Sequence, residues 1–283
     1  MASMTPASRH PVGADRAPTT PTGGIAWVDG RVLPAADATV PLLDEGLLRG
    51  DGVFEAMLVR GGRTHAAEAH LARMQRSAAA LDLPAPDVRQ VVTDLLIAWG
   101  ERDGVLRLIV TRGGTVRGIL TGAPRIESCS LAVVETPWRT AITGIKTLSY
   151  AANQWAVRRA REQDADDALL VEDGRVLELP TGAIGLVHDG RVSSPDPARL
   201  PILDSVTVRA LAELVEVERT TPSLDDVRRA DEAFVLSATR PVVPVHAIVV
   251  GEQELVLPAP GPVAADLRAR MDEHITATRD PLP

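Results

Sequence analysis

The sequence has almost no lysine. Of its 30 basic residues only Lys146 is a lysine, so the other 29 are arginines. Arginine supplies surface charge and pairs well with carboxylates, but its guanidinium does not lose its proton in proteins. A desolvated lysine does lose its proton near neutral pH, and can then act as a base or form a Schiff base with a carbonyl. The single lysine is therefore either an accident of composition on an exposed loop or a residue required for its chemistry.

Cysteine and metal-ligand patterns are equally scarce. The one cysteine, Cys129, cannot form an internal disulfide and has no companion at metal-ligand spacing, which fits a reducing cytoplasm. We expect it to be a small buried hydrophobe. The 6 histidines show no HExxH spacing, so no metal site is predicted.

Long apolar runs and an excess of positive charge are also missing. No stretch of about 18 apolar residues is present, which predicts no transmembrane helix and no membrane partner. Residues 1–24 lack the apolar core of a secretory signal, so we expect a cytoplasmic protein. The net charge of −8 disfavours nucleic acid as a partner. It leaves small anionic ligands open, because these bind local sites.

What the chain does contain is enough apolar residues for a core, and strong turn signals. It has 283 residues, of which 45% are hydrophobic. Residues 1–24 are rich in Pro, Thr, Ser and Gly and predict a disordered tail. From Ile25 on, β-rich segments are joined by Asp-Gly or Gly-Gly pairs typical of hairpins: IAWVDGRVL, VFEAMLVRGGRTH, LLVEDGRVLE and IGLVHDGRVSS.

Helical patterns lie among these hairpins without regular alternation. They cover roughly 66–82, 86–100, 151–163, 205–217 and 262–277. This order predicts an α+β fold and not a doubly wound parallel sheet. We expect an N-terminal domain over 25–135, a linker at 136–140 and a C-terminal domain over 141–283.

Two residues of the C-terminal half suggest a catalytic pair. Lys146 ends a short apolar stretch just before a predicted helix, where burial in a cleft between domains would lower its pKa. Glu178 ends the strand-like VLE after the turn at Asp173 and Gly174. Its carboxylate either faces solvent or pairs with a buried protonated nitrogen, as enzymes that use pyridoxal 5'-phosphate require.

Two further segments carry candidate anion-binding groups. In ILDSVTVRALAEL, Asp204 and Ser205 precede a helical pattern, and an N-cap is the first interpretation. Free N–H groups at a helix start also attract an anion, and Thr207 would add a hydroxyl. Arg73 lies one helical turn from His70, and is either solvated or turned inward toward a phosphate.

Taken together, these segments resemble the class IV pyridoxal-phosphate enzymes, fold type IV. The resemblance covers Ile25 to about His274. It is carried by LLDEGLLRGDGVFEAMLVRGGRTHAAEAHLARMQRSAAAL, IKTLSYAANQWAVRRAREQDADDALLVEDGRVLE and RRADEAFVLSATRPVVPV. It implies a two-domain α+β protein with a smaller N-terminal α/β domain and a larger, antiparallel-rich C-terminal domain that binds the cofactor. It also implies a homodimer with its sites at the domain interface.

The resemblance implies a role for each candidate residue. Lys146 would form the Schiff base with pyridoxal 5'-phosphate, and Glu178 would pair with the pyridinium nitrogen. A set of residues from three segments would surround the phosphate: Arg73, Ser205, Val206 through its N–H, Thr207 and Ala238.

The reaction stays open between three interpretations. SATRPVVPV has Ala238 where transaminases of the family usually offer threonine, and this pattern and KTLSYAAN resemble the 4-amino-4-deoxychorismate lyases. Such a lyase eliminates pyruvate to give 4-aminobenzoate for folate synthesis. The alternative is an aminotransferase acting on branched-chain or D-amino acids. The third is a degenerate, non-catalytic relative, suggested by Ser205 in place of a glycine and by the apolar turn Leu179–Ala183. The sole lysine at the Schiff-base position argues against that third interpretation.

The lyase substrate would be a small molecule with two carboxylates, which calls for arginine. Arg107 in LRLIVTRG and Arg240 beside the Ala238 loop are candidates, with Arg112 behind them. Each could equally be a structural ion pair. Tyr150 either stacks near the site or only packs.

Overall fold

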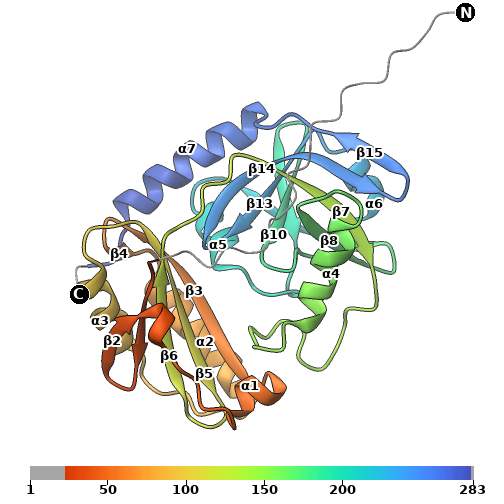
Figure 1. Cartoon of the computed structure of the whole chain (residues 1–283). Helices are drawn as coiled ribbons and strands as arrows, with labels where there is room; N and C mark the ends of the chain where they lie inside the picture. The colour runs from red at the N-terminus through yellow and green to blue at the C-terminus, as the bar shows by residue number, and fades with distance from the viewer. Residues whose placement is uncertain (1–22, 282–283) are drawn as a thin grey trace, which may run out of the picture.

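The computed structural model describes residues 23–281. The predicted disordered tail, residues 1–24, therefore lies almost wholly outside the described residues. Two β-sheets, each with its own packed helices, make up the described part of the chain (Figure 1). This arrangement confirms the predicted α+β fold class.

The first sheet is wholly antiparallel and has the strand order β2-β1-β6-β5-β3-β4. Its strands are β1 (Ile25–Val28), β2 (Arg31–Pro34), β3 (Gly52–Arg60), β4 (Arg63–Thr64), β5 (Gly104–Thr111) and β6 (Val116–Thr121). The helical segments of this part are η1 (Ala35–Asp37), α1 (Glu45–Arg49), α2 (Ala67–Ala80) and α3 (Arg89–Trp99). The sequence patterns predict α2 and α3 but neither of the two short segments.

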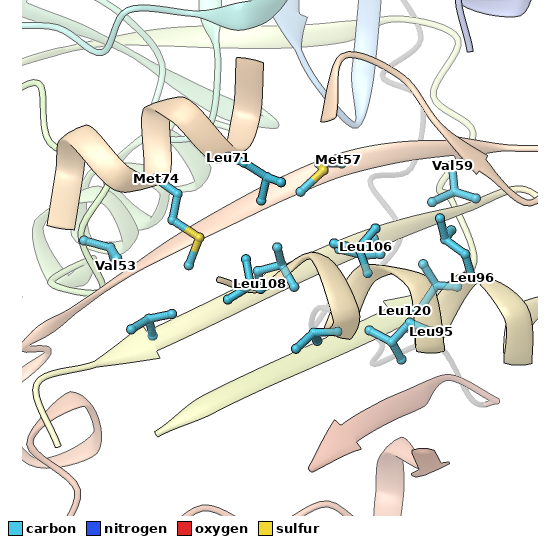
Figure 2. Close-up of a cluster of buried hydrophobic side chains, with 14 of the residues drawn as sticks. Val53, Met57, Val59, Leu71, Met74, Leu95, Leu96, Leu106, Leu108 and Leu120 are labelled. Atoms are coloured by element: carbon cyan, nitrogen blue, oxygen red, sulfur yellow. The ribbon is translucent and has the colours of Figure 1, made fainter. Parts of the chain in front are cut away.

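The core of this part lies between the sheet and helices α2 and α3. Successive side chains of a strand alternate between the two faces of a sheet. In β3 this alternation turns Val53, Met57 and Val59 toward the core, where Leu71 and Met74 of α2 meet them (Figure 2). The packing fixes β3 against α2, and both elements contribute to the site described below.

The Asp-Gly turns form as predicted, and their geometry explains the residue choice. Asp29, Asp173 and Asp189 have φ angles of 49°, 50° and 49°. The glycine after each of them also has a positive φ, of 82°, 69° and 74° respectively. Positive φ at both central residues is the type I′ turn that matches the twist of a hairpin. The hairpins β1-β2, β8-β9 and β10-β11 result.

The second sheet has nine strands in the order β12-β11-β10-β13-β14-β7-β8-β9, with β15 also paired to β14. Five of its eight strand pairs are antiparallel, as expected for the larger domain. Its strands are β7 (Cys129–Glu135), β8 (Asp167–Glu172), β9 (Arg175–Val176), β10 (Ala183–His188), β11 (Arg191–Pro195), β12 (Val217–Thr220), β13 (Glu232–Ser237), β14 (Arg240–Val250) and β15 (Gln253–Val256).

Strand β7 corrects the expected division of the chain. The sequence predicts an N-terminal domain that ends at residue 135 and a linker at 136–140. In the structure β7 pairs with β14 and β8 of the second sheet, so the chain leaves the first sheet at Thr121 and crosses at 122–128. The run SLAVVE predicts a strand but not its partner, because sheet pairing leaves no local mark in the sequence. Cys129, at the start of β7, is buried as expected.

The helices of the second part are α4 (Ala151–Arg161), α5 (Val206–Ala212), α6 (Leu224–Arg228) and α7 (Pro262–Ala277). Helix α5 is shorter than the predicted 205–217, because the chain turns after Ala212 to begin β12, which pairs in parallel with β11. Helix α7 packs on β13 and β14 and leads back to the first sheet, where Asp280 N donates to Thr64 O at 2.9 Å. None of the helices within residues 23–281 is long and apolar enough to cross a membrane.

Candidate active site

A cavity of about 620 Å³ opens between the two sheets. Its wall comes from β3 and β5 of the first sheet and from the segments 137–154, 178–183, 203–207 and 236–239. Three of the seven aromatic residues of this aromatic-poor chain line it: Phe54, Trp138 and Tyr150. The volume lies within the range of small-molecule sites, roughly 300–1,000 Å³.

Lys146 lies on the wall of this cavity, held by its own backbone. The segment runs antiparallel to the start of β3: Phe54 N donates to Lys146 O at 3.1 Å, and Leu148 N donates to Gly52 O at 2.8 Å. The ammonium Nζ lies 4.2 Å from the centre of the Phe54 ring, whose other neighbour is Tyr150, edge-on at 5.1 Å. The lysine is thus not an accident on an exposed loop.

The surroundings make the Lys146 amine reactive. Burial lowers its pKa from the ordinary 10.5 to about 8, although the carboxylates of Glu55 and Glu178 act in the opposite direction. A neutral amine at near-neutral pH is a nucleophile for carbonyl carbons and a base for carbon-bound protons.

Glu178 lines the same cavity. The residues after β9 continue in extended form along β8, with Leu170 N donating to Glu178 O at 3.0 Å. Its side-chain Oε2 accepts a hydrogen bond from Leu203 N at 3.1 Å. Burial raises the pKa of this carboxyl to about 7, and the Leu203 N–H and the nearby Lys146 charge oppose that rise. Two interpretations of Glu178 were open: a carboxylate that faces solvent, and one that pairs with a buried protonated nitrogen. Because the side chain is buried in the cavity wall, the structure favours the second.

Arg73 faces inward from α2, as one of its two interpretations predicts. Its Nε and Nη2 donate to Glu55 at 2.7 and 2.8 Å, and its Nη1 donates to Asp204 O at 3.1 Å. Glu55 is a residue that the sequence analysis missed. It stands in β3 between Val53 and Met57 on the core-facing side, and a carboxylate in such an apolar row is the signal that could have revealed it.

The start of α5 has the features that both of its interpretations require: an N-cap, and N–H groups without a partner in the helix. Ser205 is the N-cap, and its Oγ accepts from Val208 N at 3.3 Å. The first intrahelical bond is donated by Arg209 N, so the N–H groups of Val206 and Thr207 have no partner within the helix. Ser205 and Thr207 line the cavity, whereas the Val206 side chain is buried behind it.

The remaining candidates divide into two groups. Ala238, Tyr150 and Arg107 line the cavity. The Arg107 side chain is exposed and forms no hydrogen bond or ion pair with any residue in the part of the chain that the structure describes. Burial raises the pKa of the Tyr150 hydroxyl.

Arg240 and Arg112 lie outside the cavity wall and are structural. Arg240 donates to Thr181 Oγ1 at 2.7 Å and lies 3.8 Å from the Asp167 carboxylate, so it supports the turn before β10 from behind. Arg112 pairs with Asp51 on the surface and donates to Leu81 O at 2.8 Å. For these two arginines the structure favours the ion-pair interpretation.

The donor set of the cavity suits a phosphorylated aldehyde with a protonated ring nitrogen. It combines one reactive amine, one buried carboxylate, and a cluster of N–H and O–H donors at Arg73 and Thr207. In addition, Trp138 Nε1 is the one buried side-chain nitrogen or oxygen within residues 23–281 that lacks a hydrogen-bond partner. Burial raises the pKa of Glu178 and the Trp138 side chain opposes that rise, so it faces that carboxylate on the cavity wall.

Comparison with known proteins decides the family. A family model described as amino-transferase class IV matches residues 52–248, which contain Lys146, Glu178 and Arg73. The chain belongs to the class IV aminotransferases. Enzymes of this class use pyridoxal 5'-phosphate, so the cofactor expected from the sequence is confirmed.

Relatives of this class IV chain differ in the reaction they catalyse. A bifunctional aminodeoxychorismate lyase / D-amino acid transaminase of Mycobacterium tuberculosis is 33% identical over 230 residues, which cover 69% of this chain and 78% of the relative. A D-alanine aminotransferase of Bacillus licheniformis is 27% identical over 273 residues, which cover 87% of this chain and 95% of that relative. A solved structure of a hypothetical aminotransferase from M. tuberculosis, in its apo form, matches with a TM-score of 0.81 and 30% identity, covering 90% of this chain and 100% of that chain. The fold expected for the class is therefore confirmed.

Proposed function

We propose that the cavity binds pyridoxal 5'-phosphate between the two sheets, with Lys146 as the covalent attachment point. Glu178 pairs with the protonated ring nitrogen. Arg73, the N–H and hydroxyl of Thr207 and the N–H of Val206 would hold the phosphate at the start of α5, beside Ser205 and Ala238. When bound, this cofactor supplies a sink for the electrons of a broken carbon–hydrogen bond. The donor set of the wall supports the proposal.

Each residue has a separate role in the proposed reaction. The Lys146 amine accepts the proton from the carbon that carries the substrate amino group. The pKa of Glu178 is about 7 without a partner. Paired with the protonated ring nitrogen, Glu178 would be ionised and would keep the proton on that nitrogen, which would favour release of the carbon-bound proton. Phe54 and Tyr150 cover the lysine and exclude water from the amine. Lys146 then returns its proton where the product requires it.

We further propose that the main reaction is that of a 4-amino-4-deoxychorismate lyase. Lys146 takes the proton from the aminated ring carbon, the bond to the enolpyruvyl oxygen breaks, and pyruvate and 4-aminobenzoate leave. The observation that carries this choice is Arg107, a cavity-lining arginine without an ion-pair partner among residues 23–281, which suits a carboxylate of this cyclic dicarboxylic acid. The bifunctional M. tuberculosis relative supports the same choice.

Transamination of D-amino acids is a second candidate activity of the same site. It is favoured by the second activity of that relative and by several D-alanine aminotransferases among the matches. A form of the M. tuberculosis aminotransferase with alpha-ketoglutarate and PMP bound, at TM-score 0.81 and 29% identity, also supports it.

Product assays test both proposals with one preparation. The purified protein is loaded with pyridoxal 5'-phosphate and given 4-amino-4-deoxychorismate, D-alanine with 2-oxoglutarate, or L-leucine with 2-oxoglutarate. We expect 4-aminobenzoate and pyruvate in equal amounts from the first. A protein that forms D-glutamate or L-glutamate but no 4-aminobenzoate is a transaminase and not a lyase. No product from any mixture would leave the degenerate relative as the correct interpretation.

Arg107→Gln should weaken substrate binding selectively. Loss of a charge-assisted hydrogen bond costs about 1.5–3 kcal/mol, so we expect KM for 4-amino-4-deoxychorismate to rise by about tenfold or more, with kcat changed less. Steady-state kinetics of 4-aminobenzoate formation measures it. Arg112→Gln is the matched control, because Arg112 directly follows the same strand but pairs with Asp51 outside the cavity. Equal effects of the two substitutions would contradict the role of Arg107.

The loading of cofactor should follow the titration of Lys146. Because burial lowers its pKa to about 8, the amine is mostly protonated below that pH and mostly neutral above it. The rate at which the apoprotein develops the visible band of covalently held cofactor should therefore rise about tenfold per pH unit up to about pH 8 and then level off. Stopped-flow absorbance measures this rate. A rate that still rises near pH 10 would mean that the lysine keeps its ordinary pKa.

We also propose that the chain forms a homodimer through the segment 40–48. Its exposed apolar side chains are Val40, Leu42, Leu43, Leu47 and Leu48, with Leu43 83% exposed. Such a contiguous apolar surface is typical of an interface. The segment lies next to the cavity wall, since Ser149 of that wall donates to Gly50 O at 3.1 Å. The mass of one chain is 30.1 kDa, and light scattering should give twice that mass. The double variant Leu43→Glu, Leu47→Glu should be monomeric. Ile97→Glu, an exposed apolar position on α3, is the control and should stay dimeric.

A further inference from the structure

A buried carboxylate accepts two hydrogen bonds from Arg73, the arginine proposed for phosphate binding. Glu55 is 0% exposed and accepts from Arg73 through both of its oxygens, Oε1 at 2.7 Å and Oε2 at 2.8 Å. His70, one helical turn before Arg73, places its Nδ1 2.8 Å from Glu55 Oε2. Since Oε2 is a carboxylate oxygen, His70 carries its proton on Nδ1 and donates it there. Neither Glu55 nor His70 lines the large cavity.

The contacts with Glu55 and Asp204 hold the Arg73 guanidinium in one orientation. A guanidinium has five N–H donors in a fixed plane. Nε and Nη2 are bound to Glu55 on the core side, and Nη1 donates to Asp204 O at 3.1 Å, just before the N-cap Ser205. The edge that stays open is therefore the Nη1 edge, beside the start of α5. A side chain with this many fixed partners loses little further entropy when it binds a ligand.

The charges explain why a carboxylate can lie so close to an anion site. Burial alone would raise the pKa of Glu55, but the hydrogen bonds from Arg73 and His70, together with their charges, lower it to about 2. Glu55 is thus ionised, and its negative charge balances the positive charge of Arg73. An unbalanced buried guanidinium would be costly. A phosphate is then attracted by directed donors, not by excess positive charge.

We propose that Glu55 and His70 are positioning residues for the phosphate site, which hold the Nη1 edge of Arg73 toward Thr207 and the start of α5. The inference rests on the proposed role of Arg73 in phosphate binding. It predicts that both residues affect the recognition of the phosphate group and not of the aldehyde or ring.

The test compares two ligands of the full-length apoprotein. Pyridoxal 5'-phosphate and pyridoxal share the ring and the aldehyde, and only the first has a phosphate. Absorbance titrations give a dissociation constant for each. Glu55→Gln keeps the side-chain size but removes the charge, and should raise the constant for pyridoxal 5'-phosphate by about tenfold or more while changing that for pyridoxal by less than about twofold. His70→Leu should act in the same direction. His70→Asn, whose amide can donate from a position near that of Nδ1, should restore most of the affinity.

Glu232→Gln is the matched control. Glu232 is also a buried carboxylate, but it accepts from Val263 N and Ala264 N at the start of α7, away from the cavity. Its substitution should leave the preference for the phosphorylated ligand unchanged. If Glu55→Gln fails to fold, as judged by thermal unfolding, the two His70 variants decide the question.

Two results would overturn the inference. Equal weakening of both ligands by Glu55→Gln and His70→Leu would mean that the pair only supports the fold, and no effect on either would mean that Arg73 needs no support. An Arg73→Gln variant separates this inference from the proposed site. If that variant loses the phosphate preference while the Glu55 and His70 variants keep it, only the positioning role fails; if it keeps the preference, the proposed phosphate site fails as well.

Discussion

Lys146→Ala and Lys146→Arg will both lose turnover, by roughly 10⁴-fold. The alanine variant lacks the amine. The arginine variant keeps a positive charge in the same place, but a guanidinium cannot lose its proton and become the nucleophile or the base. Neither variant should develop the visible band of covalently held cofactor. Product assays and absorbance spectra measure the two effects, and an active arginine variant would contradict the assignment.

Folding and chemical rescue separate the loss of chemistry from the loss of structure. The backbone of Lys146 is held by β3, and its side chain contacts the cavity and the Phe54 ring, so both variants should keep their circular dichroism spectrum. Lys146→Ala leaves room for a small amine, and added methylamine should restore part of its activity. The arginine variant fills that room and should not respond.

Glu178→Gln will lose activity by about 10²–10³-fold, the cost typical of removing one preorganised group that stabilises developing charge. The amide keeps the size of the side chain but carries no charge to hold a proton on the ring nitrogen. Steady-state kinetics of the loaded protein measures the loss. Glu135→Gln is the control, because that carboxylate lies exposed at the end of β7, near the same hairpin, where it accepts from Gly174 N at 3.3 Å.

Glu178→Gln should not lower the stability of the apoprotein. Burial raises the pKa of Glu178 from 4.5 to about 7, so the folded state binds this proton more tightly than the unfolded state. Stability gained from the protonated group is then lost as pH rises from about 4.5 through 7. Glu178→Gln removes that loss, and its melting temperature at pH 8 should equal or exceed that of the unaltered protein. A variant that is less stable and fully active would contradict both the burial and the role.

Local chemistry is the reason that much of the fold can be predicted. The hairpins follow from Asp-Gly pairs such as Asp29 and Gly30, whose positive φ angles the residue types themselves favour. Helices α2, α3, α4 and α7 follow from apolar periodicity. Helix α5 ends earlier than its pattern, because pairing of β12 with β11 outweighs helix propensity beyond Ala212. Similarly, the local sequence of β7 predicts a strand but not its partners, and only the tertiary fold assigns it to the second sheet.

The site divides in the same way. Lys146 could be singled out from the sequence because a lone lysine among arginines is a compositional signal. Arg107 and Arg240 could not be told apart, because apolar stretches flank both: Arg107 lies within β5 and Arg240 begins β14. In the structure Arg107 lines the cavity without an ion-pair partner among residues 23–281, whereas Arg240 contacts Thr181 and Asp167 behind the wall.

By itself, the sequence determined the turns and most helices, since each of these depends on neighbours within a few positions. Its resemblance to a known family implied the class of cofactor chemistry and the residues that carry it. Only the tertiary structure decided which charges meet. Glu55 and Arg73 are 18 residues apart and Arg73 and Asp204 are 131 apart, and a contact across such distances depends on how β3, α2 and α5 pack. The depressed pKa of Lys146 likewise arises from burial in a cavity that neither half of the chain forms alone.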